Sequence, residues 1–332
     1  DDAMAHSLRF VVVGSGNICK TYLQVAKNLT HAEIVGIVSR SGTRPAEASD
    51  EISIASTLQD MDVAFDAVIL ATPNGLHHQD AIQAARLGKH VLTEKPLDIT
   101  IDNMDAMIEA CQEAGVKLGV TYQHRKSPDN QTIKKLIDAG QLGRILAADF
   151  TVYCWRDQAY YNSGEWRGGW AIDGGGPFIQ QACHQVDLYV WFFGMPSTVL
   201  SMTDRFLHDI EVEDHGVGIF RHDNGMIGTF IASTIANPGF DPVLTIISEK
   251  WTVVMENGRI TGWHIRCMEN PSTEPQGALH SGAASAAVTD TALHEAIVDD
   301  FITAVHEDRD PCVTGESARL TTELILQVYG RG

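Results

Sequence analysis

The sequence predicts an α/β domain wound on both faces of a parallel sheet, followed by an α+β domain built on an open antiparallel sheet. Three observations support this. Apolar runs alternate with helical patterns over the first 123 residues, and after Tyr122 strand-like runs follow one another with only turns between them. The length of 332 residues suits two domains of ordinary size.

The first domain is expected to contain five parallel strands. The candidate strands are LRFVVVG, IVGIVSR, AVILATP, HVLTEKP and KLGVTYQ, and amphipathic stretches such as 18–29 and 103–114 separate them as helices. The runs are apolar at consecutive positions, which is typical of strands that are covered on both faces. We place this domain at residues 1–124.

The second domain, residues 125–332, begins with a helix at 130–139, the strand ILAADFTVYC and a long apolar helix over 177–193. Six strand-like runs follow between 198 and 265, and turns such as HDNG and MENG predict antiparallel hairpins. A polar loop near 270–285 precedes helices at 291–306 and 316–329. The last of these is a candidate to pack back on the first domain.

Composition excludes several classes of protein. The net charge of −19 argues against a nucleic-acid partner, and no apolar run approaches the roughly 20 residues of a membrane span. The opening DDAMAHS lacks the features of a signal peptide and reads as a cloning remnant. Six cysteines without a CxxC pair fit reduced, mostly buried thiols, so we expect a cytoplasmic protein.

The stretch VVVGSGNICKTY, residues 11–22, predicts a dinucleotide-binding turn. Gly14 permits the sharp turn from strand to helix, and Gly16 lets a pyrophosphate approach the helix start at Asn17 and Ile18. Cys19 replaces the third glycine of GxGxxG, which weakens the match. A purely structural turn is the alternative.

The end of the second strand favours NADP(H), with NAD(H) as the alternative. NAD sites place a carboxylate there for the ribose 2′-hydroxyl, but this chain has Ser39 and Arg40, then Arg44, and no acid before Glu47. A hydroxyl and a guanidinium suit a 2′-phosphate. Two solvated arginines in a loop remain the alternative.

Several segments together resemble the Gfo/Idh/MocA oxidoreductase family. They are GSGNIC, the tripeptide EKP, DAGQLGRI at 138–145 and GGGPFIQQACHQVDLYVWFFG at 174–194. The resemblance covers essentially the whole chain, including the order of domains. The resemblance implies a Rossmann domain and an open sheet that often packs against another subunit, hence a homodimer or homotetramer. It also implies hydride transfer between a nicotinamide and a sugar or cyclitol hydroxyl.

The resemblance identifies Lys95 as the catalytic lysine, with a Lys95–Pro96 bond that is cis in relatives, and His184 as the acid/base histidine with Asp187 as its partner. An imidazole suits proton transfer near neutral pH, and an ammonium stabilises a developing alkoxide. Gln180 stands where many relatives have Asp, so it is expected to bind a substrate hydroxyl or carbonyl. A core histidine and a surface lysine are the alternatives.

The remaining site residues follow from strand ends and from the resemblance. Arg125 is assigned, with Gln180 and Asp187, to a hydroxylated or anionic substrate, and Gln123 to the nicotinamide region. A metal site at the adjacent His77 and His78 is rejected, because neighbouring residues splay apart on a helix. The expected cofactor contacts are Gly14, Gly16, Asn17, Ile18, Ser39, Arg40, Arg44, Thr72, Pro73, Asn74, His77, Glu94, Lys95, Gln123, Trp166 and Arg167.

The sequence therefore predicts an NADP(H)-dependent dehydrogenase or reductase that acts on CH–OH groups of a small polyhydroxylated molecule. Two alternatives stay open. A protein of this fold can bind the dinucleotide as a sensor or regulator without catalysis. It can also be a redox-neutral glycosidase that retains its nicotinamide.

Overall fold

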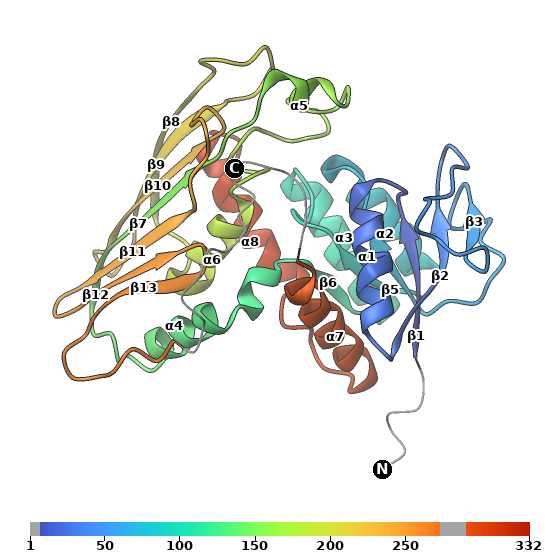
Figure 1. The fold of residues 1–332 in the computed structure, drawn as a ribbon, viewed down its shortest axis with the longest axis horizontal. Coiled ribbons are helices and arrows are strands. Elements are labelled where there is room, and N and C mark those ends of the chain that lie inside the picture. Colours follow the sequence, from blue (N-terminus) through green and yellow to red (C-terminus); the bar gives the residue numbers. More distant parts are fainter. Residues whose placement is uncertain (1–6, 273–289) are drawn as a thin grey trace. The chain divides into compact units, whose positions relative to one another are not determined.

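The computed structural model describes residues 7–272 and 290–332, which form two compact units (Figure 1). The first unit contains residues 1–123 and 290–319, and the second contains residues 124–289 and 320–332. The opening residues 1–6 and most of the predicted polar loop at 270–285 lie outside the described residues.

The first unit is built on a six-stranded parallel sheet with the order β3-β2-β1-β4-β5-β6. Its strands are β1 (Leu8–Val13), β2 (Ala32–Val38), β3 (Ser53–Ala55), β4 (Ala67–Leu70), β5 (His90–Thr93) and β6 (Leu118–Val120). Its helices are α1 (Asn17–Asn28), η1 (Asn74–Leu76), α2 (His77–Arg86), α3 (Ile101–Ala114) and α7 (Ala292–His306). The sheet confirms the predicted doubly wound fold and adds the short edge strand β3.

Helix α7 belongs to this first unit although it follows residues 124–289 of the second unit in the sequence. Its Phe301 ring lies 6.4 Å from the Phe10 ring and packs on Gly119, where a Cβ would come within 2.8 Å of the Phe301 ring. The N–H of Val120 donates to the carbonyl of Val313, so the segment after α7 extends the edge of the sheet at β6. The core of the first unit is therefore closed by a distant part of the chain.

The second unit is built on a seven-stranded sheet with the order β13-β12-β11-β7-β10-β9-β8. Its strands are β7 (Ile145–Tyr153), β8 (Thr198–Asp204), β9 (His215–Arg221), β10 (Ile227–Ser233), β11 (Val243–Ser248), β12 (Thr252–Glu256) and β13 (Arg259–His264). All neighbours pair antiparallel as predicted except β7 and β10, which pair parallel from Ala147 opposite Ile227. The two hairpins that the turn residues predicted are present: Gly225 lies between β9 and β10, and Asn257 and Gly258 between β12 and β13, all at positive φ.

Several helical segments accompany this sheet: the single turn η2 (Gln123–Lys126), α4 (Pro128–Asp138), α5 (Gln158–Asn162) and α6 (Cys183–Phe193). Helix α8 (Gly315–Val328) begins in the first unit and ends in the second. Tyr189 of α6 packs against Phe220 of β9 and contacts Phe230 of β10, with ring centroids 5.2 and 6.4 Å away. These contacts place α6 on one face of the sheet.

The predicted helix over 177–193 is wrong in its first part, because α6 begins only at Cys183. Residues 177–182 form turns, and the N–H of Ala182 reaches back five residues to the carbonyl of Pro177. The N–H groups of Gly176 and Phe178 are bound by the carboxylate of Glu213, so the segment is anchored to another element before the helix starts. Gln180 therefore lies outside the helix that carries His184, although the predicted helix included both residues.

Two further observations concern the whole described chain. Among residues 7–272 and 290–332, none of the helices combines the length and apolar character that crossing a bilayer requires. Four of the six cysteines are buried, and none forms a disulfide within the described ranges.

Candidate functional site

The turn after β1 has a backbone shape that glycine alone fits easily. Gly14 has φ +111°, and a Cβ there would lie 2.7 Å from the carbonyl oxygen of Ala71. A Cβ on Gly16 would meet nothing within 4 Å, and no side chain caps the start of α1 there. Gly14 is thus required by the protein itself, whereas Gly16 and the exposed Asn17 leave open space at a helix N-terminus, where an anion is stabilised.

The end of β2 carries a hydroxyl and a guanidinium. Ser39 is buried and its hydroxyl lies 3.1 Å from that of Ser15, while Arg40 is exposed. Arg44 donates to the carbonyl of Ser49. The nearest downstream acid, Glu47, is paired with Lys20 of α1 at 3.2 Å.

The loops after β4 and β5 are tied together by His77. The ring is buried, with Nδ1 2.9 Å from the carbonyl oxygen of Pro96 and Nε2 2.9 Å from that of Thr72. The Thr72 hydroxyl donates to Asp80 of α2. His77 therefore braces the loop that holds Lys95, whose peptide bond to Pro96 is cis, as the resemblance implies.

Glu94 and Lys95 differ in their surroundings. The Glu94 carboxylate is 9% exposed and accepts a 2.6 Å hydrogen bond from Tyr22 of α1, and Lys95 is half-buried. Burial, together with the Glu94 charge, raises the pKa of Tyr22 well above its ordinary value. Asn74, also predicted as a cofactor contact, is buried in η1.

Gln123 ends the strand run after β6 and has an unsatisfied polar atom. Its side-chain oxygen is buried and has no hydrogen-bond partner among the described residues. Leaving such an acceptor without a partner costs about 1–3 kcal/mol, so this position suits a ligand that donates a hydrogen bond. The amide of a nicotinamide ring is such a donor, and the residues at this edge fit that cofactor.

In the second unit, Arg125 and Asp187 form a buried ion pair. Nε and Nη2 of Arg125 donate to the two carboxylate oxygens at 2.8 and 2.6 Å, and the Thr321 hydroxyl of α8 donates to Asp187 at 2.9 Å. Both charged side chains are almost completely buried. The pair joins η2 to the middle of α6.

His184 lies in the first turn of α6 and stacks on His124 of η2. The ring centroids are 4.4 Å apart and the ring planes differ by 11°. Both histidines are partly exposed. Lys95 belongs to the first unit and His184 to the second, and their convergence on one substrate stays a prediction.

Gln180 is held by Asp173, a residue that the sequence did not single out. The Gln180 amide nitrogen donates to both the carbonyl and a carboxylate oxygen of Asp173, and the other carboxylate oxygen accepts from the N–H of Gly168. Asp173 is 3% exposed. A carboxylate thus orients the amide of Gln180.

Trp166 and Arg167 are grouped with an aromatic side chain from α5. The Arg167 guanidinium carbon lies 4.4 Å from the Trp166 ring centroid and 4.5 Å from that of Tyr160, and the guanidinium donates to the Tyr160 hydroxyl. Gln181 donates to the same hydroxyl. This arrangement fixes the arginine between two rings.

Two of the three glycines before Gln180 are required by close neighbours. A Cβ on Gly175 would lie 2.5 Å from the Tyr329 ring, and one on Gly176 would lie 1.9 Å from the Glu213 carbonyl oxygen. Burial raises the pKa of the Glu213 carboxyl to about 7, although Tyr329 and the N–H groups of Gly176 and Phe178 donate to it.

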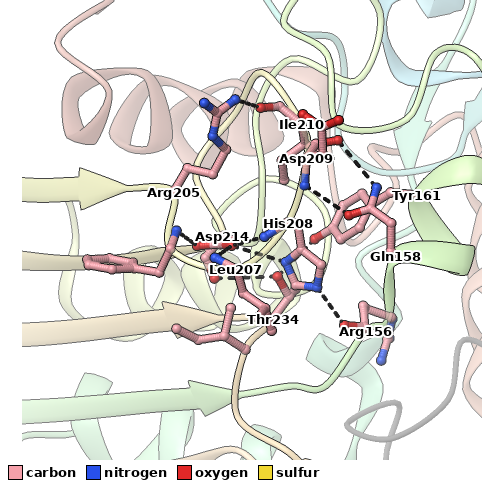
Figure 2. A network of polar contacts seen from close by, with 12 residues as sticks. Arg156, Gln158, Tyr161, Arg205, Leu207, His208, Asp209, Ile210, Asp214 and Thr234 are labelled. Carbon is pink, nitrogen blue, oxygen red and sulfur yellow. Dashed lines mark hydrogen bonds and ion pairs between the residues drawn. The ribbon is translucent and has the colours of Figure 1, made fainter.

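A polar network holds the loop between β8 and β9 (Figure 2). Asp214 accepts the N–H groups of Phe206, Leu207 and His208, and the His208 ring bridges Asp214 and the carbonyl of Arg156. Burial opposes the charged carboxyl, but these donors hold its pKa below its ordinary value.

This network fixes the loop against neighbouring elements. The loop's Glu211 N–H donates to the carbonyl of Gly168, and its carboxylate accepts the N–H of Trp170. Gln158 of α5 exchanges two hydrogen bonds with the backbone of Asp209 (Figure 2).

The sequence missed four residues that contact the predicted site residues or the segment before Gln180: His124, Tyr160, Asp173 and Glu213. His124 adjoins the predicted pair Gln123 and Arg125, and Asp173 directly precedes the motif at 174–194, whereas Tyr160 and Glu213 stood in segments without a recognised motif. The described residues contain no group of three or more His, Cys, Asp or Glu side chains that could hold a metal ion.

Comparison with known proteins finds a matching family model for each of the two units. Residues 8–122 match the family described as "Oxidoreductase family, NAD-binding Rossmann fold", and residues 130–261 match "GFO/IDH/MocA C-terminal domain". The WlbA dehydrogenase of Bordetella pertussis, solved in complex with NADH and UDP-GlcNAcA, is 32% identical with a TM-score of 0.86, over 98% of this chain and 96% of that chain.

Curated relatives also match over nearly their full length. The 1,5-anhydro-D-fructose reductase of Ensifer adhaerens is 27% identical over 93% of this chain and 91% of the relative. The NAD⁺-dependent scyllo-inositol 2-dehydrogenase of Bacillus subtilis is 26% identical over 97% and 93%. With its NAD-binding Rossmann domain, its C-terminal sheet domain and these relatives, the chain belongs to the Gfo/Idh/MocA family of NAD(P)-dependent oxidoreductases.

Proposed function

We propose that this protein is an NADP(H)-dependent dehydrogenase or reductase that transfers hydride to or from a hydroxyl or keto group of a sugar, sugar derivative or cyclitol. One observation carries the proposal. The carboxyl edge of the first sheet collects the Gly14 turn, the half-buried Lys95 and the buried, unsatisfied oxygen of Gln123. Ligands of open α/β sheets bind at this edge.

A bound nicotinamide supplies or accepts the hydride. The Lys95 ammonium donates a hydrogen bond to the reacting oxygen and stabilises its negative charge as the proton leaves. The His184 imidazole accepts that proton during oxidation and returns it during reduction. Gln180, oriented by Asp173, binds a hydroxyl next to the reacting carbon.

The preference for NADP(H) rests on the end of β2. The exposed Arg40 can bind a 2′-phosphate, and the nearest downstream acid in the sequence, Glu47, is paired with Lys20. Fluorescence titration should show NADPH bound more tightly than NADH. Arg40→Ala should reduce that difference, while Arg86→Ala, on the last turn of α2, serves as a control. Equal affinities in the wild type would contradict the assignment.

The substrate class is tested with a panel of free sugars, uronates, cyclitols and nucleotide-linked sugar acids, assayed with both cofactors. The last group is included because the 32% identical WlbA dehydrogenase was solved with UDP-GlcNAcA. Reduction of NADP⁺ by a member of the panel supports the proposal. Tight cofactor binding without turnover of any member would favour a sensor, and glycoside cleavage without net NADPH formation would favour a redox-neutral glycosidase.

We also propose that the open face of the second sheet binds another copy of this chain. Leu200 and Met202 of β8 and Ile219 of β9 lie on one face, since Leu200 pairs with Ile219, and they are 62%, 85% and 46% exposed. Sedimentation should show a homodimer or homotetramer. Leu200→Glu with Met202→Glu should shift it to smaller species, and a wild-type monomer would contradict this part of the proposal.

A further inference from the structure

The stacked pair His124 and His184 is one contact of a series between η2 and α6. His184, Asp187 and Trp191 are spaced three and four residues apart, so they lie on one side of the helix. His184 meets the His124 ring, Asp187 binds Arg125, and Trp191 lies under the Arg125 guanidinium at 5.7 Å. Two adjacent residues of η2 thus contact three successive turn positions of α6.

Two further contacts make His124 a fixed platform. The side-chain amide of Asn130 in α4 donates a 2.9 Å hydrogen bond to the His124 carbonyl. The buried, bidentate Arg125–Asp187 pair holds the next residue of η2 against α6. Because the backbone on the C-terminal side of the His124 ring is anchored twice, the ring plane has little freedom to move away from His184.

The stack restricts rotation of the His184 ring about its Cβ–Cγ bond. The torsion that rotates an imidazole about its Cβ–Cγ bond has a broad energy profile, so an unsupported ring samples many tilts. A second ring at 4.4 Å and 11° favours the parallel tilt. It covers one face of His184 and leaves the ring edge, where the nitrogens lie, for hydrogen bonding.

We propose that His124 is a positioning residue, whose ring fixes the plane of the His184 imidazole so that its nitrogen meets the reacting hydroxyl. This inference rests on the proposed function, in which His184 transfers the proton. His124 acts through its ring face, so an aromatic side chain without a proton to transfer can replace it.

Steady-state kinetics of His124→Ala and His124→Phe test the proposal. His124→Ala should lower kcat roughly tenfold to a hundredfold, because small misplacements of a reacting group have effects of this size. Its KM and its Kd for NADPH should change little. His124→Phe should restore most of kcat. If His124→Phe is as impaired as His124→Ala, or if neither is impaired, the positioning role is refuted.

The matched control is His222→Ala. His222 is also an imidazole that contacts α6, since its Nε2 lies 2.8 Å from the Tyr189 hydroxyl, but Tyr189 is more than a helical turn beyond His184. This variant should lose comparable stability and keep its kcat. If His222→Ala and His124→Ala lost kcat equally, the loss would come from a general destabilisation of α6 and not from the stacked ring.

A readout without turnover separates this inference from the proposed function. In protein labelled at histidine, the ring Cε1–H resonance of His184, assigned by its absence in His184→Asn, should be shielded by the His124 ring. It should move downfield in His124→Ala and stay in place in His124→Phe. An unmoved resonance in His124→Ala refutes the stack whether or not the wild type is active, whereas inactivity on every substrate with the expected resonance refutes only the proposed function.

Discussion

Replacing Glu213 by glutamine should change how the stability of the second unit depends on pH. The carboxyl is buried, and its pKa is raised from 4.5 to about 7 by burial, despite donors from Tyr329, Gly176 and Phe178. Between these two values the folded state binds more protons than the unfolded state. The wild type therefore loses free energy of unfolding as the pH rises through this window, and a glutamine side chain, which does not titrate, removes that loss.

The size of the effect follows from the two pKa values. A difference of 2.5 between about 7 and 4.5 corresponds to about 3 kcal/mol, because one pKa unit corresponds to about 1.4 kcal/mol. The free energy of unfolding of Glu213→Gln minus that of the wild type should therefore rise by about 3 kcal/mol from acidic pH to above pH 7. The absolute stability of the variant is set separately by the hydrogen bonds that the amide loses.

Urea unfolding followed by tryptophan fluorescence measures this difference, because Trp170 packs 5.1 Å from the Tyr329 ring beside Glu213. The series is repeated at several pH values across the window. Glu211→Gln is the matched control, since it removes an exposed carboxyl from the same segment. Parallel pH profiles for Glu213→Gln and the wild type would refute the buried, titrating carboxyl.

Four further substitutions test separate parts of the structure. Asp187→Ala should destabilise by about 3–5 kcal/mol in urea unfolding because it leaves a buried Arg125 charge unpaired, and Asp187→Leu with Arg125→Met should recover much of this; an equal loss in the double variant would contradict it. Gly176→Ala should cost about 3 kcal/mol or more, since its Cβ would overlap the carbonyl of Glu213 in the loop between β8 and β9, and an unchanged melting temperature would disprove that contact. His77→Ala should lower thermal stability and NADPH affinity together, and a change in neither would remove its bracing role. Lys95→Ala should reduce kcat by about a hundredfold to a thousandfold with the Kd for NADPH retained, and a fully active variant would discard the mechanism.

The elements that the sequence predicted correctly are those with local causes. Consecutive apolar residues marked the buried parallel strands, and Asn257 with Gly258 marked a hairpin because both adopt positive φ. The parallel pairing of β7 and β10 was not predictable in this way. It joins residues 80 positions apart, such as Ala147 and Ile227, and no turn signals it.

Site residues could be predicted where they belong to a sequence motif. Their contacts with residues far away in the sequence could not be predicted. Motif spacing placed Asp187 and His184 on one helix, but it could not reveal that the Asp187 carboxylate binds Arg125 and Thr321. The 177–193 helix was overpredicted for a related reason. The N–H groups of Gly176 and Phe178, at its predicted start, are bound by the carboxylate of Glu213. Glu213 lies more than thirty residues away in a loop with several acidic residues, and nothing in the sequence connects it with this segment.

The position of α7 bears on how such a protein diversifies in evolution. The Rossmann sheet is finished by residues 290–319, which the ribosome makes only after residues 124–289 of the second unit, and Phe301 supplies part of its core. A single genetic crossover that traded everything after residue 123 would leave the ancestral sheet with a foreign closing helix. Exchange of the second unit without that helix therefore requires three breakpoints, near residues 123, 290 and 319, which favours divergence by point substitution within a lineage over shuffling of modules.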